Sequence, residues 1–145
     1  MKATATMGHT GFRTEIRTGQ TRTHTLIADE PAGKGDDAGP TPIEMLAGAI
    51  ASCTTLTLRS YANVKGIRLD GVNVDVEIVR RKPSERRDGE HDLLIRKRVE
   101  IRGELTPAQH ARMLEVADKC TVLKALLEGV DLEVLTPEAA NSSAQ

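Results

Sequence analysis

Aromatic residues are nearly absent from this sequence: the 145 residues include one tyrosine, one phenylalanine and no tryptophan. Any hydrophobic core must therefore be aliphatic. The same shortage argues against single-stranded nucleic-acid binding, because base stacking needs aromatic platforms. Charge of one sign is also not in excess, with a formal net charge of -1 at pH 7, so nothing attracts the chain to DNA or to anionic membranes. We expect neither a nucleic-acid nor a membrane partner.

Several sequence signals for export and for common site chemistries are missing. The N-terminus has no apolar segment of the kind found in a signal peptide, which predicts a cytoplasmic protein. There is no glycine-rich phosphate loop and no nucleophile elbow, so a hydrolase is set aside. The four histidines are scattered without the spacing of metal ligands; they are His9, His24, His91 and His110. We expect a protein that needs neither a metal nor a cofactor.

Cysteine is scarce too, with only Cys53 and Cys120 in the chain. In a chain without export signals, both thiols are expected to start reduced. Such a pair is more often catalytic, redox-active or simply buried than a structural disulfide. All three roles stay open at this point.

The stretch that organises the chain is residues 41–61. Thr41 suits a helix cap, Pro42 the first helical position, and Glu44 the third position of a capping box. No charged residue then appears until Arg59, whereas a surface helix would carry a polar stripe. The stretch is too short and too rich in Ala, Ser and Thr to span a membrane. It predicts a helix buried inside the domain.

Alternation of apolar and polar side chains predicts strands on both sides of this helix. The expected elements are extended segments within 1–30, strands at 67–78 and 93–101 around an exposed loop at 82–92, helices from 106 to about 118 and from about 120 to 128, and a short strand at 130–135. We pair the two long strands as an antiparallel hairpin. The order indicates one α+β domain, residues 1–136, with an antiparallel sheet wrapped around a long buried central helix. Residues 137–145 form a polar C-terminal tail.

The all-apolar character of the central helix has a consequence for assembly. Such a helix needs cover on every side, and one small curved sheet covers only one side. A second subunit could supply the rest, so the sequence suggests a homodimer.

Packing of the central helix against the later helices could bring the two thiols together. One thiolate would then attack an electrophilic oxygen or sulfur and become a sulfenic acid, which the other thiol would resolve to a disulfide. A helix N-terminus would lower the pKa of Cys120. Cys53, in apolar surroundings, would need a cationic or hydrogen-bonding neighbour to ionise.

Two stretches around the cysteines resemble a known family. Gly-Pro-Thr-Pro-Ile-Glu-Met-Leu at 39–46, before Cys53, and Ala-Asp-Lys-Cys-Thr-Val at 117–122, around Cys120, are similar to the OsmC/Ohr family. Its members are the osmotically inducible protein C and the organic hydroperoxide resistance proteins. The resemblance extends over nearly the whole chain and implies an intertwined α+β homodimer.

The resemblance also implies a function. Many members are thiol peroxidases that reduce organic hydroperoxides in oxidative-stress defence, so Cys53 would be peroxidatic and Cys120 resolving. An external dithiol reductant would restore the pair. The alternative is a non-enzymatic OsmC-like protein that binds an apolar small molecule at the dimer interface.

The residues that activate the thiolate in the best peroxidases of the family are not matched here. Those proteins carry a glutamate ten residues before the first cysteine, and this glutamate holds an activating arginine. Ile43 stands at that position, and Glu44 is displaced by one residue, which turns it away from the cysteine on a straight helix of about 100° per residue. The arginines on the N-terminal strands that could serve are Arg13, Arg17 and Arg22.

Overall fold

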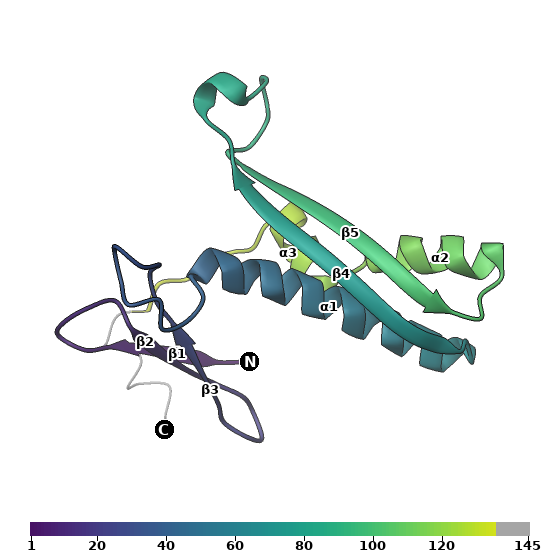
Figure 1. Ribbon diagram of the computed structural model, residues 1–145, viewed down its shortest axis with the longest axis horizontal. Helices are drawn as coiled ribbons and strands as arrows, with labels where there is room; N and C mark the ends of the chain where they lie inside the picture. The colour runs from purple at the N-terminus through teal and green to yellow at the C-terminus, as the bar shows by residue number, and fades with distance from the viewer. Residues whose placement is uncertain (136–145) are drawn as a thin grey trace.

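The computed structural model describes residues 1–135 as an α+β fold with three helices and two antiparallel sheets (Figure 1). The elements in chain order are β1 (Ala3–Met7), β2 (Thr14–Thr18), β3 (His24–Ala28), α1 (Pro42–Lys65), β4 (Leu69–Arg80), a 3₁₀ turn η1 (Pro83–Glu85), β5 (Leu93–Gly103), α2 (Pro107–Ala117) and α3 (Thr121–Glu128). The predicted order of strands, long helix, hairpin and two helices is therefore confirmed.

Helix α1 begins as the sequence predicts. The Glu44 N–H donates to Thr41 Oγ1 at 3.3 Å, and the Glu44 carboxylate accepts from the Thr41 N–H at 2.7 Å, which completes a capping box. At the other end, Gly66 adopts a left-handed conformation with φ 61°, which a glycine adopts without steric cost. The chain can then turn directly into β4.

In the described part of the chain, the fully buried residues of α1 lie on one face. Every fourth residue is covered, namely Ile50, Thr54, Leu58 and Ala62. On other faces of the helix Leu56 is 68% exposed and Val64 82%. The predicted burial on all sides is thus not achieved by one chain alone.

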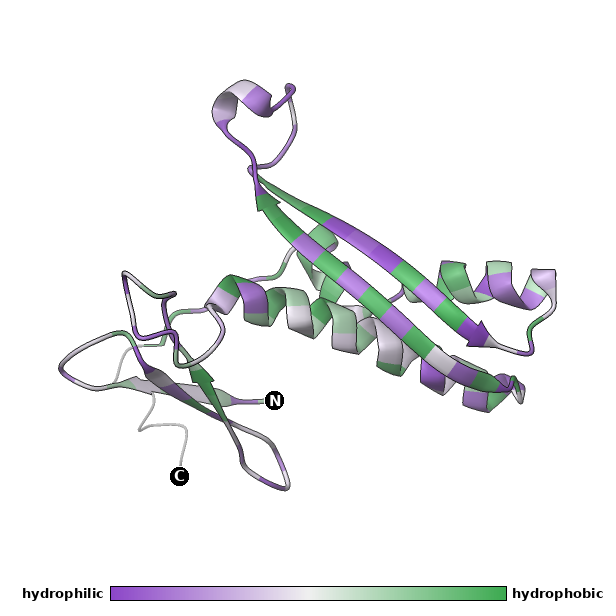
Figure 2. Cartoon of the chain, in the orientation of Figure 1, coloured by the Kyte–Doolittle hydropathy of each residue, from purple (hydrophilic) through white to green (hydrophobic). Residues whose placement is uncertain are grey.

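Strands β4 and β5 form the long hairpin that covers α1. Their apolar side chains pair across the ladder, with Val74 opposite Val99 and Ile78 opposite Ile95. Figure 2 shows the resulting alternation of hydrophobic and hydrophilic bands along both strands. The buried core forms where this hairpin, α1 and α2 meet, and consists of Leu58, Ala62, Leu69, Met113, Val116 and Ala117.

The N-terminal strands form a separate antiparallel sheet in the order β1-β2-β3. The predicted alternation in β2 is confirmed, because Ile16 is half-buried between the exposed Glu15 and Arg17. Figure 1 shows this sheet beyond the N-terminal end of α1. Both Phe12, 42% exposed, and Leu26, 45% exposed, keep much of their apolar surface in water. The prediction of a single sheet wrapped around the helix was therefore wrong for one chain: residues 1–135 form two sheets, and of these the hairpin is the one that packs along α1.

The end of the described chain also differs from the prediction. Residues 130–135 carry the alternation of a strand, but they pair with no strand within residues 1–135. Their apolar side chains are exposed, with Leu132 at 86%. Alternation alone does not make a strand when no sheet edge lies beside it. The predicted domain end at 136 and the tail at 137–145 lie outside the described residues.

Candidate functional site

The site is built where the middle of α1 meets the start of α3. Cys53 is partly exposed on α1, and Cys120 is fully buried at the N-cap position of α3. Both are free thiols. Because α2 ends at Ala117 and α3 begins at Thr121, the short link between them carries Cys120 against α1.

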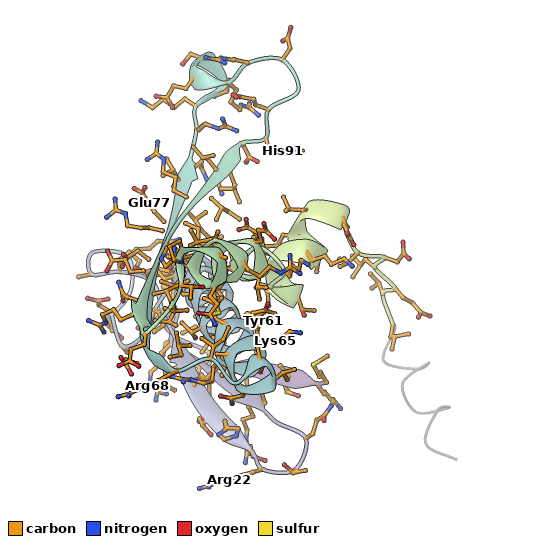
Figure 3. All side chains as sticks on the ribbon, turned by 90° about the vertical axis from the view of Figure 1, so that its right-hand side faces the viewer. Arg22, Tyr61, Lys65, Arg68, Glu77 and His91 are labelled. Carbon is orange, nitrogen blue, oxygen red and sulfur yellow. The ribbon has the colours of Figure 1, made fainter. Side chains whose placement is uncertain are left out.

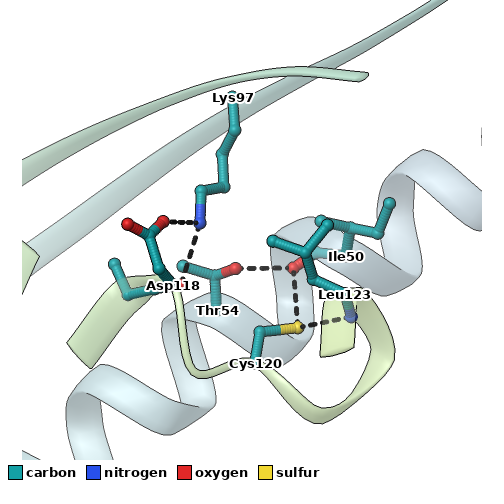
Figure 4. A network of polar contacts seen from close by, with 7 residues as sticks. Ile50, Thr54, Lys97, Asp118, Cys120 and Leu123 are labelled. Carbon is teal, nitrogen blue, oxygen red and sulfur yellow. Dashed lines mark hydrogen bonds and ion pairs between the residues drawn. The ribbon is translucent and has the colours of Figure 1, made fainter. Parts of the chain in front are cut away.

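The Cys120 side chain is held by two backbone groups (Figure 4). Its Sγ accepts a hydrogen bond from the Leu123 N–H at 3.5 Å, so the thiol is the N-cap of α3. The same Sγ lies 3.9 Å from the Ile50 carbonyl oxygen, to which its proton donates. That carbonyl also accepts from the buried Thr54 hydroxyl at 2.8 Å. The buried Cys120 thiol is thus fixed in place from both sides.

The surroundings of Cys53 favour its thiolate. Burial is the largest single influence and raises the pKa of the Cys53 thiol. Hydrogen bonds from the Cys120 side chain and from the backbone N–H groups of Val122 and Thr121 lower it. Together with Thr57, these donors outweigh burial, so the pKa of Cys53 lies below its ordinary value. The two N–H donors belong to the N-terminus of α3, where unpaired N–H groups stabilise a negative charge.

Thr57 can serve only one acceptor at a time. Its hydroxyl donates to the Cys53 carbonyl oxygen at 2.8 Å, and a hydroxyl carries one proton. It must rotate away from that carbonyl to donate to the thiolate. The Cys120 thiol has the same limit, because its one proton donates to the Ile50 carbonyl oxygen. The backbone N–H groups of α3 need no such rearrangement and are the more dependable donors.

A hollow of about 550 Å³ opens beside Cys53. Its lining consists of Ala49, Ser52, Cys53, Leu56, Thr57, Ser60, Lys119, Thr121 and Val122. Apolar carbons and hydroxyl groups make up most of this surface, and Lys119 carries its one charge. The hollow is large enough for a small organic molecule to reach the Cys53 sulfur.

Sequence reasoning missed Lys97, which supports the link between α2 and α3. Its ammonium donates to the Ala117 carbonyl oxygen at 2.9 Å and pairs with Asp118 at 2.8 Å (Figure 4). The Lys97 side chain is only 12% exposed. A signal was present, because Lys97 shares the inward phase of β5 with Ile95 and Val99.

The activating residues considered from the sequence do not reach Cys53 within this chain. Glu44 is engaged with Thr41, whose backbone hydrogen bond lowers the pKa of the Glu44 carboxyl. Arg13 lies beside Asp29, whose pKa it helps to lower. Arg17 lies on β2 and Arg22 in the turn after it (Figure 3). The groups that lower the pKa of Cys53 are therefore donors of α1 and α3, and no arginine is among them.

Neither a metal site nor a membrane span is found in the described part of the chain. Within residues 1–135, histidine, cysteine and carboxylate side chains nowhere gather in threes as a metal ion would require. No helix within the same residues has the length and apolar character needed to cross a bilayer.

Comparisons with known proteins give one family and one fold. The family model described as OsmC-like protein matches residues 33–135. A search of curated proteins gave no match. The OsmC-like protein of Mycoplasma pneumoniae superposes with a TM-score of 0.69 at 21% identity, covering 89% of this chain and 87% of that chain.

Two solved structures of organic hydroperoxide resistance proteins share the fold. An organic hydroperoxide resistance protein of Legionella pneumophila has a TM-score of 0.60 at 22% identity, over 91% of this chain and 92% of that one. The organic hydroperoxide resistance protein OhrB of Bacillus subtilis has a TM-score of 0.56 at 19% identity, over 91% and 93%. At these identities the likeness shows the fold alone.

Proposed function

Because this chain belongs to the OsmC-like protein family, we propose that it reduces organic hydroperoxides through Cys53 and Cys120. The observation that carries the proposal is the environment of Cys53: its sulfur faces a hollow, receives N–H groups from α3 and has a second thiol within hydrogen-bond reach. A thiolate is the form that attacks a peroxide, so a lowered pKa at an accessible sulfur favours this chemistry.

The reaction proceeds in three steps. The Cys53 thiolate attacks the outer peroxide oxygen, the O–O bond breaks, and the leaving alkoxide takes a proton to become an alcohol. Cys53 is then a sulfenic acid. The Cys120 sulfur attacks the Cys53 sulfur, the S–O bond breaks, and hydroxide leaves with the Cys120 proton as water. An external dithiol returns both cysteines to thiols by exchange, and is itself oxidised to a disulfide.

The lining of the hollow favours an organic substrate over hydrogen peroxide. Leu56 and Val122 contribute apolar surface beside the Cys53 sulfur. An alkyl or lipid-like hydroperoxide buries its chain against this surface and gains roughly 25 cal/mol per Å² of apolar area removed from water. Hydrogen peroxide has no such group to bury. We also place the protein in the cytoplasm, where a dithiol reductant is at hand.

A homodimer completes the site. The apolar residues of α1 that one chain leaves exposed include Leu56, which lines the hollow. The β1–β3 sheet also leaves apolar surface in water, including Leu26 on β3, and covering it is favourable. A second copy placed on this side would cover α1, cover the sheet and narrow the hollow into a cleft.

The experiment is a thiol titration with cumene hydroperoxide. One equivalent should remove both thiols, leaving a disulfide within the chain and one equivalent of cumyl alcohol. Cys53→Ser should consume no peroxide, whereas Cys120→Ser should take one oxidising equivalent and stop at a sulfenic acid that dimedone traps. Peroxide consumption by Cys53→Ser at the parental rate would refute the assignment.

A second candidate is a non-enzymatic protein that binds an apolar molecule in the same hollow. The absence of an arginine among the groups that stabilise the Cys53 thiolate favours it. The same titration separates the two, since a binder leaves both thiols unreacted.

A further inference from the structure

Lys97 is a charged residue on the buried face of the hairpin. It stands opposite Val76 in the β4–β5 ladder, between the inward-facing Ile95 and Val99. Its neighbours Arg96 and Arg98 point to the other face and are exposed. A lysine at such a position loses hydration, which is costly unless its three donors find acceptors.

The acceptors that Lys97 finds belong to the link between α2 and α3. The Ala117 carbonyl is one of the groups that α2 leaves unpaired at its C-terminus, and Lys97 donates to it at 2.9 Å. Asp118 is the next residue and pairs with the same ammonium at 2.8 Å. One cation from β5 therefore holds both the last carbonyl of α2 and the first residue of the link.

The same link delivers the catalytic groups. Asp118 is two residues before Cys120, and Thr121 and Val122, whose N–H groups serve the Cys53 thiolate, follow immediately. A shift of this link moves the Cys120 sulfur and both N–H donors together, because they lie on consecutive residues. Hydrogen bonds weaken steeply once their distance or angle departs from the favourable range.

We propose that Lys97 is a positioning residue of the thiol site: by binding Ala117 and Asp118 from β5, it fixes the α2–α3 link so that Cys120 and the first N–H groups of α3 face Cys53. It touches neither sulfur and acts through the link. This inference rests on the thiol chemistry proposed above, and it adds a residue of the hairpin to a site otherwise formed by helices.

The test compares Lys97→Met with Arg96→Met. Methionine keeps most of the length of the lysine stem without the charge. Arg96 is adjacent on β5 and also forms an ion pair, with Glu77 at 3.1 Å, but on the exposed face. It is therefore a matched control for the loss of one cation and one ion pair from this strand.

The first readout is the pH dependence of iodoacetamide labelling at Cys53, in variants that lack Cys120 and in variants that keep it. The other ionisable groups facing this thiol are Cys120 and Lys119, and both stay unchanged within each set. We expect Lys97→Met to slow labelling at neutral pH by about tenfold, which corresponds to a rise of about one pKa unit. Arg96→Met should label like the parent, and Lys97→Arg should restore most of the rate.

The second readout is the rate of disulfide formation after one peroxide equivalent. Lys97→Met should leave Cys53 as a dimedone-reactive sulfenic acid for longer than the parent does. If Lys97→Met does not fold, Asp118→Ala provides the perturbation at a side chain that is 74% exposed, and it should shift both readouts in the same direction by less.

The outcomes separate this inference from the proposed function. A parent that labels slowly and never forms the disulfide refutes the proposed function. If the parent labels rapidly and forms the disulfide, but Lys97→Met and Asp118→Ala do the same at unchanged rates, the role of Lys97 alone is refuted. An equal effect of Arg96→Met also refutes it, because the effect would then be one of general charge on the strand.

Discussion

Leu56→Ser is expected to weaken self-association of the protein strongly. Leu56 lies in the middle of α1 and is 68% exposed in the single chain. Full burial of a leucine side chain contributes about 1.5–3 kcal/mol, and about two thirds of that remains to be gained at this residue. In a two-fold symmetric dimer the residue counts twice.

The expected loss is therefore about 2–4 kcal/mol, which raises the dissociation constant by about 30- to 700-fold at 1.4 kcal/mol per tenfold. Sedimentation equilibrium over a range of protein concentrations measures this constant directly. Leu56→Met is the control, because it conserves volume and apolar area and should keep the dimer.

Two results would refute the reasoning. A parent protein that sediments as a monomer at all concentrations would show that no second copy covers α1. A dimer of unchanged affinity in Leu56→Ser would show that the contact lies elsewhere on the chain.

Three further predictions concern stability. Met113→Ala removes a side chain with no exposed surface from the core cluster and should lower the free energy of unfolding by about 2–5 kcal/mol in urea titrations; a loss below 1 kcal/mol would argue against that cluster. Thr41→Ala removes the cap of α1 and should cost about 1 kcal/mol in the same assay, whereas Thr41→Ser should cost much less. Asp29 accepts the N–H groups of Ala38 and Glu30, and its pKa is lowered chiefly by the first of these. Its contribution to stability is thus complete above the ordinary carboxyl pKa of about 3.9 and disappears as the pH falls through the lowered value. Asp29→Asn should accordingly lower the melting temperature more at pH 7 than at pH 3, and a constant difference would contradict the assignment.

The parts of the fold that could be predicted are those with local signals. The spacing of Thr41 and Glu44 predicts the start of α1, and the structure has the corresponding capping box. The alternation in β4 and β5 is long enough to predict which side chains face α1, and Val72 and Val99 indeed pack against the core cluster that includes Leu58 of α1.

The parts that could not be predicted depend on what lies beside an element. Residues 130–135 alternate as well as β2 does, but they have no paired edge in the described chain. The exposed face of α1, with Leu56, looks in the sequence like any buried face. Composition indicates that such a face needs cover, but it does not indicate which neighbour supplies it.

Within the site, the two cysteines could be singled out from the sequence, whereas the N–H groups and the lysine around them could not. Cys53 and Cys120 stand out because cysteine is scarce. The N–H groups of Thr121 and Val122 have no sequence signature, since every residue except proline has one. Lys97 lies among charged residues in the sequence, and only its strand phase distinguishes it from Arg96.

The Cys120 sulfur caps α3 and is also the proposed disulfide partner of Cys53, and this combination affects the redox equilibrium. In the reduced protein this sulfur receives the Leu123 N–H and begins α3, a contact that depends on the sulfur staying at the cap. When the sulfur turns to bond Cys53, α3 loses that cap, and its first turn becomes less stable. A contact that is present in the dithiol and weakened in the disulfide raises the reduction potential of the couple. In the proposed peroxidase cycle, the helix therefore favours return to the dithiol.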